Sequence, residues 1–431
     1  MRAFSPPFIL ALWMVLAASG CAGSGQDAEP APPTASSEDA DFHGTWPQWG
    51  GPQGMFRVDA SDLADNWPEG GPPRLWEREL GPGYSSMVVE NDELFTMYRD
   101  KDNDVVIALD ATDGSTRWEY RYSGNTYEGN VLDFGTGPNA SPLLLDDRVI
   151  ALGFGGMLHA LARDTGEVLW SHDLIIDLGG EVQDFGYSAS PILHDGTILV
   201  PMGGDHSIVA MDPEDGSIRW QSGPRGISYS TPLVIDVDGR EQVVFFSGVE
   251  ILGIDAGDGH ELWSFPVKSQ YSNNATNLHW QEGNLLWVAA ELDAGTRVLR
   301  LTREQETIKV EEVWSSNKMS IHHWNTVVVD GHIYGSFGGQ GSILQSIELA
   351  TGHVLWRERG FPKINSIYAD GKLIFLDEKG RLGLARVSPQ KIEVLARAQV
   401  ATEEAWTVPI LAGSVLYVRD NKKILALDLG T

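Results

Sequence analysis

The sequence predicts an all-β fold, an eight-bladed β-propeller of four-stranded antiparallel blades, and three observations support it. An eleven-residue motif that ends in tryptophan recurs along the chain. Its tryptophans lie 42 to 52 residues apart, a period typical of a propeller blade or a solenoid unit. The final copy, Ala426–Thr431, stops before its tryptophan, and the missing half occurs near the N-terminus at Leu75–Leu80. A motif divided between the two chain ends is expected of a closed ring. The complete copies are Ala108–Trp118, Ala160–Trp170, Ala210–Trp220, Gly253–Trp263 and Ser346–Trp356.

Each repeat is expected to form four short strands. Short β-rich runs such as Glu93–Tyr98 and Thr197–Pro201 alternate with Gly, Asn and Asp, which terminate strands. Between residues 45 and 431 no stretch has a convincing amphipathic helical pattern, and this excludes a helical solenoid. Ser-Pro or Thr-Pro pairs at Pro142, Pro191 and Pro232 mark inner strands, because proline is tolerated at the first residue of a strand.

Each part of the motif has a structural task. An aspartate such as Asp110 ends the third strand and can accept hydrogen bonds from the following turn. Gly114 and its equivalents can adopt a positive φ without steric cost. The tryptophan on the fourth strand can cover the gap between neighbouring blades, with its indole N–H bonded to a backbone acceptor. The predicted docking residues are Trp76, Trp118, Trp170, Trp220, Trp263, Trp314 and Trp356.

Seven blades are predicted to start near residues 85, 139, 188, 229, 275, 324 and 366. The eighth combines residues 406–428 with an N-terminal strand at about 74–80, which removes a free sheet edge. Two repeats are degenerate. The segment Leu301–Trp314 is four residues longer than Leu109–Trp118, and the seventh blade has no tryptophan, with Leu395 near its place.

The motif resembles the tryptophan-docking repeat of the pyrroloquinoline-quinone (PQQ) type β-propellers, over nearly all of residues 74–431. The segment Trp46–Pro52, with the sequence WPQWGGP, also resembles the start of many bacterial PQQ-like repeat proteins. This resemblance implies the fold. Function has to be argued from sites, because propellers host many functions.

The N-terminus predicts export and lipidation. Residues 1–20 are typical of a signal peptide, with Arg2 before an apolar core. The sequence Ala-Ser-Gly before Cys21 resembles a lipobox, which implies that Cys21 is the acylated N-terminus; an ordinary signal peptide with a stray cysteine is the alternative. Residues 21–42 are predicted to form a disordered tether and 43–73 a lead-in segment to the ring at 74–431. Ala22 after the cysteine suggests, by resemblance, export to an outer membrane, facing the periplasm.

Composition narrows the possible partners. A formal charge of −29, from 31 basic and 60 acidic residues, argues against nucleic acid, which binds through Lys and Arg. It also argues against direct adsorption to anionic lipid, so membrane attachment is expected through the lipid alone. We expect a solvated acidic surface on a monomer; an acidic patch for a basic partner is the alternative. A single cysteine forbids disulfides and cysteine-based metal sites.

The mouth of the central channel is the predicted binding region, because the loops before the eight inner strands converge there with polar and aromatic residues. The alternative is that these polar groups only cap strand backbones. No metal is expected, since His322 and His323 would point to opposite faces if they lay on a strand. The candidate residues are Tyr84, Asn139, Tyr187, Tyr229, Asn274, His322, His323, Trp324, Glu403 and Trp406.

Three functions are consistent with this sequence. A noncatalytic envelope scaffold is the leading hypothesis, because the lipobox, tether and ring resemble the family of the outer-membrane assembly lipoprotein BamB. This resemblance implies envelope partners, such as an assembly barrel complex, and no cofactor. In that family, interblade loops contact the barrel protein beside a pair of acids that residues 227–232 lack. A PQQ- and calcium-dependent dehydrogenase is the first alternative, although one cysteine cannot supply that family's vicinal pair. A periplasmic binder of small molecules or glycans at the mouth is the second.

Overall fold

The computed structural model describes residues 41–226, 229–267, 274–290, 294–338 and 341–431. The predicted signal segment, the predicted lipidation site Cys21 and residues 22–40 of the predicted tether lie outside these ranges. The ring lies within the unit Pro32–Thr431. In the described part of the chain, no helix is long and apolar enough to cross a bilayer.

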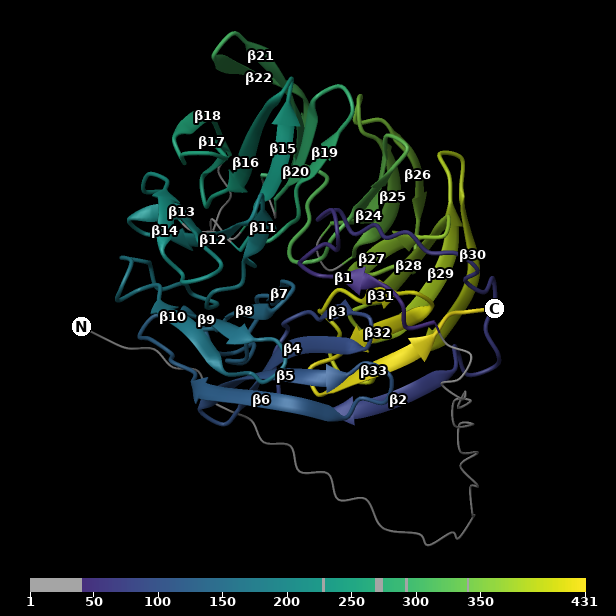
Figure 1. Cartoon of the computed structure of the whole chain (residues 1–431). Helices are drawn as coiled ribbons and strands as arrows, with labels where there is room; N and C mark the ends of the chain where they lie inside the picture. Colours follow the sequence, from purple (N-terminus) through teal and green to yellow (C-terminus); the bar gives the residue numbers. More distant parts are fainter. Residues whose placement is uncertain (1–40, 227–228, 268–273, 291–293, 339–340) are drawn as a thin grey trace, which may run out of the picture. The chain divides into compact units, whose positions relative to one another are not determined.

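Eight antiparallel sheets are arranged as the blades of a propeller, as the sequence predicts (Figure 1). In most blades the chain runs from the innermost strand to the outermost, so neighbouring strands follow each other in sequence. The first four blades contain β3 (Val88–Glu90), β4 (Glu93–Asp100), β5 (Asn103–Asp110) and β6 (Thr116–Ser123); β7 (Leu143–Leu144), β8 (Arg148–Leu152), β9 (Met157–Ala162) and β10 (Val168–Asp173); β11 (Ile192–His194), β12 (Thr197–Gly203), β13 (His206–Met211) and β14 (Ile218–Gln221); and β15 (Leu233–Val237), β16 (Arg240–Phe246), β17 (Glu250–Asp255) and β18 (Glu261–Pro266).

The fifth blade contains the longest hairpin of the ring, in the segment Leu301–Trp314 where the sequence predicts additional residues.

The inner strands of the second, third and fourth blades each begin directly after the proline of a Ser-Pro or Thr-Pro pair, as predicted. The last four blades contain β19 (His279–Gln281), β20 (Leu285–Ala289), β21 (Thr296–Glu304) and β22 (Thr307–Ser316); β23 (Val327–Val329), β24 (His332–Phe337), β25 (Ile343–Glu348) and β26 (Val354–Glu358); β27 (Ile364–Ala369), β28 (Lys372–Asp377), β29 (Arg381–Val387) and β30 (Ile392–Gln399); and β31 (Ile410–Ala412), β32 (Val415–Arg419), β33 (Lys423–Asp428) and β2 (Arg74–Glu79).

The two ends of the propeller sequence share the eighth blade. Strand β2 pairs antiparallel with β33, and Trp76 lies opposite Ala426 in the register of the other motif tryptophans. Figure 1 shows the purple β2 beside the yellow β33. The N-terminal strand therefore completes the C-terminal blade, as predicted.

A β-bulge precedes every motif tryptophan. In the first blade Trp118 pairs with Ala108 and Thr116 pairs with Leu109, so that Arg117 is unpaired. The same one-residue shift occurs in the seventh blade, where Ala396 takes the tryptophan register and Leu395 is the bulged residue. A bulge bends and twists its strand. The outer strands thus share one local geometry even in the blade without tryptophan.

The tryptophans join neighbouring blades. Six indole N–H groups donate to a backbone carbonyl of the following blade, over 2.7 to 3.1 Å. Trp263 differs, because the fifth blade that follows it has the long β21–β22 hairpin in place of the short motif turn. The indole N–H of Trp263 donates instead to Gln242 of its own blade. The six donor and acceptor pairs are Trp76 and Ala111, Trp118 and Arg163, Trp170 and Pro213, Trp220 and Ala256, Trp314 and Leu349, and Trp356 and Ser388.

The lead-in segment closes the channel. Strand β1 (Thr45–Trp46) adds to the inner edge of β3, on the inner side of the ring (Figure 1), and Trp46 is buried. The next residues bond to the second and third blades, from Leu144 N to Pro47 O and from Leu193 N to Gln48 Oε1.

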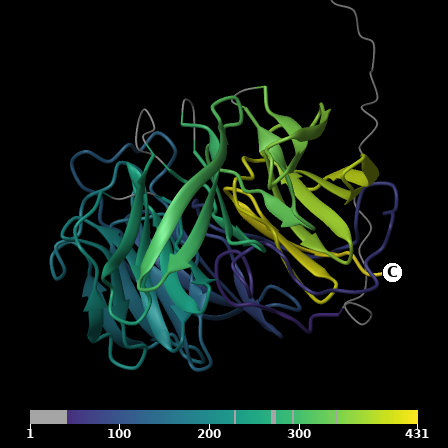
Figure 2. The same ribbon diagram turned by 90° about the horizontal axis from the view of Figure 1, so that it is seen from above.

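The same segment then crosses to the other side of the ring. Phe56, also fully buried, accepts a hydrogen bond from the backbone of Tyr368 in the seventh blade. Leu63 forms a bridge with Gly430, beside the closing strands. Both views show the purple segment beside the yellow C-terminal strands (Figures 1 and 2). Residues 41–73 thus form a plug, and the motif WPQWGGP forms part of it.

We predict that Gly166→Ala destabilises the ring more than Gly371→Ala. Both glycines have positive φ, 73° and 69°, so both variants carry the same kind of backbone strain. A Cβ on Gly166 would lie 2.5 Å from the ring of Trp118, whereas one on Gly371 meets nothing within 4 Å. Urea unfolding should give an additional loss of about 1–3 kcal/mol for Gly166→Ala. Equal losses would contradict the docking account.

Candidate functional site: the aromatic mouth of the channel

The loops before the inner strands are joined into a closed circle of hydrogen bonds. Every neighbouring pair of blades has at least one such bond, with donor–acceptor distances of 2.6 to 3.2 Å. Most of the side chains involved are the polar residues that the sequence places at strand starts. In blade order the bonds run from Tyr84 N to Pro138 O, Ser141 N to Ser190 Oγ, Ser190 N to Thr231 Oγ1, Ser230 Oγ to Thr276 O, Thr326 N to Asn277 Oδ1, Ser366 N to Asn325 Oδ1, Asn365 Nδ2 to Trp406 O, and Ser86 Oγ to Val408 O.

Inside this circle lies a cavity of about 350 Å³ with a mainly aromatic wall. Of the ten candidate residues, six line it: Tyr84, Asn139, Tyr229, His322, His323 and Trp406. The rings contact one another in a series. Tyr84 stacks on Trp406 with centroids 5.0 Å apart, and Phe134 lies 5.9 Å from Trp406 and 6.0 Å from Phe185. Phe185 in turn lies 5.7 Å from Tyr229.

The other four candidate residues lie elsewhere. Tyr187 is buried between the second and third blades, and its hydroxyl donates to Glu181 O. Buried Asn274 donates to Ser247 O, and buried Trp324 donates to Ser336 O. Glu403 forms an ion pair with Lys422. These side chains stabilise loops and strand ends and do not line the cavity.

Four aromatic residues of the wall are absent from the sequence-based set: Trp49, Phe134, Phe154 and Phe185. Trp49 comes from the plug and reaches the cavity from the closed side, where it also packs edge-on against Phe56. Phe134 and Phe185 lie on the two longest interblade connections, between β6 and β7 and between β10 and β11. The signal in the sequence was the length of these connections, since a long loop can extend over the channel.

The loop that carries Phe134 is held at both ends by one buried arginine. Arg99 donates to Gly124 O over 2.7 Å and to Thr136 O over 3.1 Å. Its Nε also lies 3.0 Å from a carboxylate oxygen of Asp104, in a pair almost completely removed from solvent. Burial raises the pKa of Asp104 to about 6, although Arg99 and the Phe154 N–H act to lower it.

The two adjacent histidines do not point apart, contrary to the sequence-based expectation. They lie on a bend before β23 and not on a strand, and their Nδ1 atoms are 3.1 Å apart. Both therefore reach the cavity. Burial lowers the pKa of His323 to about 3, and the neighbouring His322 and Lys363 act in the same direction. His323 is thus neutral at physiological pH.

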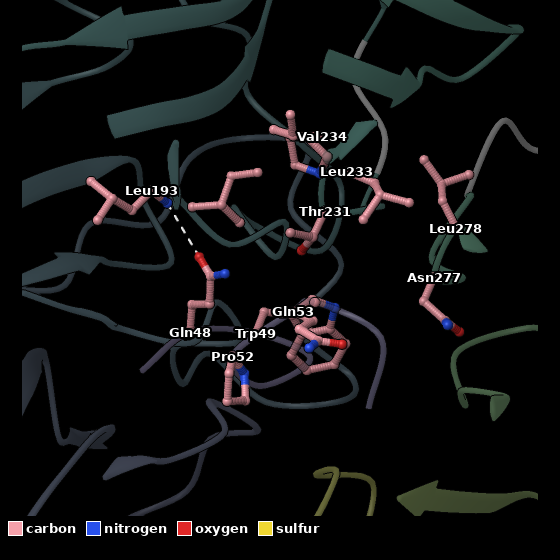
Figure 3. A pocket seen from close by; sticks show the side chains of 13 residues that line it. Gln48, Trp49, Pro52, Gln53, Leu193, Thr231, Leu233, Val234, Asn277 and Leu278 are labelled. Atoms are coloured by element: carbon pink, nitrogen blue, oxygen red, sulfur yellow. Dashed lines mark hydrogen bonds between the residues drawn. The ribbon is translucent and has the colours of Figure 1, made fainter. Parts of the chain in front are cut away.

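A second, smaller pocket of about 110 Å³ lies between the plug and the inner strands of the third and fourth blades (Figure 3). Gln48 bonds to Leu193 on one side of it, and Leu233 forms part of the opposite side. Trp49 lines both this pocket and the mouth cavity. The plug residue Trp49 therefore separates the two spaces.

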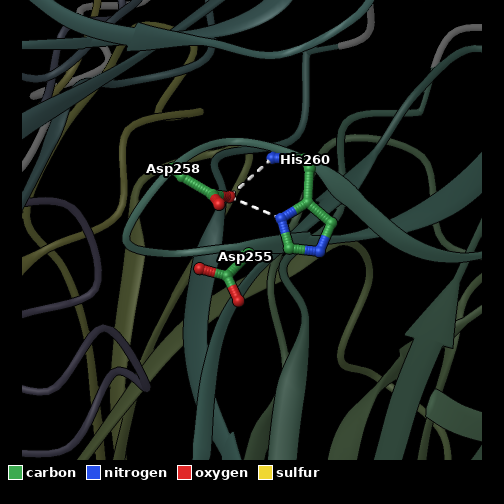
Figure 4. Close-up of side chains that lie close together, drawn as sticks. All are labelled: Asp255, Asp258 and His260. Carbon is green, nitrogen blue, oxygen red and sulfur yellow. Dashed lines mark hydrogen bonds and ion pairs between the residues drawn. The ribbon is translucent and has the colours of Figure 1, made fainter. Parts of the chain in front are cut away.

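One group of potential metal ligands occurs among the described residues, at Asp255, Asp258 and His260 (Figure 4). It belongs to a motif turn on the outside of the fourth blade. Asp258 pairs with His260 over 2.5 Å, and Asp255 pairs with Arg240 over 3.1 Å. The first and third motif turns place aspartates in the same way, capping backbone N–H groups. This arrangement is explained by the turn itself.

The mouth does not fit calcium-bound PQQ. Calcium takes six to eight oxygen ligands, mainly carboxylates and carbonyls, and the described residues that line the cavity include no aspartate or glutamate. The Nδ2 of Asn139 donates to Phe185 O and to Ser188 Oγ, and Thr231 Oγ1 accepts the bond from Ser190 N. The wall offers aromatic surface and few free oxygen ligands.

The closed ring, its docked tryptophans and its repeat define a PQQ-repeat β-propeller. The family described as outer membrane protein assembly factor BamB matches residues 69–226 and 133–358, which together make up more than half of the chain. The chain belongs to this family. BamB of Yersinia pestis is 22% identical over 294 residues, covering 64% of this chain and 70% of that protein. BamB of Escherichia coli strain K12 is 22% identical over 312 residues, covering 67% and 73%.

Solved structures of different function share the fold. BamB from Moraxella catarrhalis has a TM-score of 0.57 at 14% identity, covering 82% of this chain and 97% of its own. Quinohemoprotein alcohol dehydrogenase from Comamonas testosteroni has a TM-score of 0.62 at 12% identity, covering 91% and 82%. At such identities, the likeness to a BamB and to an enzyme shows the architecture alone.

We predict that Asp104 makes the stability of the ring depend on pH. Its folded pKa lies above the ordinary value of 3.8, so the stability contributed by the neutral carboxyl is complete below about pH 4 and is lost as pH rises through about 6. Relative to Asp104→Asn, the free energy of unfolding of the parent should fall by about 1–3 kcal/mol from pH 4 to pH 7. Urea unfolding at both pH values checks this, and a pH-independent difference would contradict it.

Proposed function

We propose that this chain is a noncatalytic, lipid-anchored envelope protein whose ring acts as a protein-interaction scaffold in outer-membrane protein assembly. The observation that carries the proposal is the family match over residues 69–358. The lipobox before Cys21 and the acidic tether support attachment to a membrane through lipid. The name of the relatives, outer membrane protein assembly factor BamB, supports a partner in the envelope, and we propose an assembly barrel complex as that partner.

The two long interblade connections supply a surface suited to a partner protein. They present exposed apolar side chains at Leu132, Phe134 and Ile176, with exposed fractions of 45%, 52% and 76%. Exposed apolar residues grouped on one face are typical of interaction sites. The connections also support each other, because Val131 N donates to Asp184 O over 2.6 Å. A partner would meet preformed loops on a stiff ring, which reduces the entropy lost on binding.

A quinoprotein dehydrogenase is supported less well. Among the described residues that line the cavity there is no carboxylate that would hold calcium, and the chain contains a single cysteine. Some of the polar groups in the wall, such as those of Asn139 and Thr231, bond to a neighbouring blade. We therefore assign no catalytic role to any residue of the mouth.

In-cell photo-crosslinking tests the scaffold proposal. A photoreactive residue at Leu132 or Ile176 should give an adduct with an envelope protein, whereas one at Val394, a comparably exposed apolar residue on β30, should not. In the same cells Cys21→Ser should move the protein to the soluble fraction and reduce the adduct, because the lipid concentrates it at the membrane.

Three outcomes would contradict this account. Adducts of equal yield from Leu132 and Val394 would show that the connections have no special role. A Cys21→Ser protein that stays with the membrane would exclude lipid anchoring. Reduction of a dye with alcohols or sugars, after addition of PQQ and calcium, would exclude a noncatalytic protein.

A further inference from the structure

The mouth cavity combines an aromatic wall with an acidic rim. Asp133, Asp184 and Glu404 are exposed and lie on the loops that form the wall. Their charges reach the lining residues. Burial raises the pKa of Tyr84 and of Tyr229 to about 12 each, and the charges of Glu404 and Asp184, respectively, act in the same direction.

Two lysines at the mouth are paired with acids. The lining residue Lys363 lies 2.9 Å from Glu378, and Lys422 lies 2.7 Å from Glu403. In contrast, none of the three rim acids Asp133, Asp184 and Glu404 forms an ion pair with another described residue. The chain as a whole carries a formal charge of −29. The field at the mouth therefore attracts cationic groups.

The polar groups of the wall indicate which kind of ligand fits. A sugar presents many hydroxyl groups, but Asn139 and Thr407 are already bonded to neighbouring loops. The indole N–H of Trp406 is buried under protein atoms. The wall therefore offers few hydrogen bonds to a sugar, and its aromatic rings are the main contact surface.

We infer that the mouth cavity is a docking site for a basic segment of a partner protein, which inserts one aromatic side chain among Trp49, Phe134, Phe185 and Trp406. These rings line the cavity, and a guest ring would pair with them at the centroid separations of about 4.5–7 Å that aromatic pairs prefer. The volume of about 350 Å³ admits one ring with its adjoining backbone. Lysine or arginine residues beside that ring would face Asp133, Asp184 and Glu404. This inference rests on the proposed scaffold function and specifies the partner's chemistry.

Fluorescence anisotropy with synthetic peptides tests the inference on the purified full mature protein. The probe is a labelled seven-residue peptide, Gly-Lys-Lys-Phe-Lys-Lys-Gly. It should bind in a salt-sensitive manner, and replacement of its phenylalanine by alanine or of its lysines by glutamates should weaken binding about tenfold or more. Equal binding of the three peptides would overturn the inference.

Variants of the protein locate the site. Phe134→Ala changes an exposed loop residue, so the fold should persist, and it should weaken the lysine–phenylalanine peptide about tenfold or more. Leu169→Ala, at a comparably exposed apolar residue on β10, is the matched control and should have no effect. Neutralising the rim by Asp133→Asn, Asp184→Asn and Glu404→Gln together should weaken binding and remove its salt dependence, unlike the control Glu167→Gln.

The test separates this inference from the scaffold proposal. A protein that crosslinks through Leu132 but does not bind the peptide would overturn the docking inference alone. Binding that Phe134→Ala leaves unchanged would also overturn it, because the peptide would then lie elsewhere. Binding of an oligosaccharide such as chitotriose in place of the peptide, with loss in Phe134→Ala, would overturn it in favour of a glycan site.

Discussion

The pairing of β2 with β33 is the constraint on which the rest of the ring depends. A propeller whose last blade lacks its outer strand presents an unpaired edge, and unpaired edges promote association with other chains. Here the strand comes from the other end of the repeat region, so closure brings residues 74–79 and 423–428 together. The bond from Ser86 to Val408 joins the first and last blades on the inner side as well. No disulfide can assist, since the chain has one cysteine.

Closure also explains why aromatic rings make up most of the surface at the mouth. Because polar groups at the strand starts hold neighbouring blades together, they are not available to a ligand, and aromatic rings from longer loops dominate the remaining surface. The plug then gives the channel a floor through Trp49. The aromatic end of the ring and its acidic rim are the features on which the proposed docking of a protein segment rests.

The fold could be predicted largely from the sequence, and the site only in part. The tryptophan period and the divided motif specify the ring because both reflect local, repeated geometry. The bulge before each tryptophan, and the place of Ala396 in the tryptophan register, depend on which residues pair across two strands. The spacing of residues in the sequence does not show this pairing. The plug and the positions of Phe134 and Phe185 depend on how non-repeating segments fold over the ring. Asn274 and Trp324 were candidates by position, but burial directs their side chains away from the cavity.

Hydrogen exchange in the native protein tests the closure most directly. If β2 is an integral strand of the eighth blade, its amides that bond to β33 should exchange as slowly as those of β32 and β33, through the same global unfolding event and with the same dependence on denaturant. If the amides of β2 exchange rapidly while β32 and β33 remain protected, the ring is stable without its N-terminal strand, and the closed-blade account is wrong.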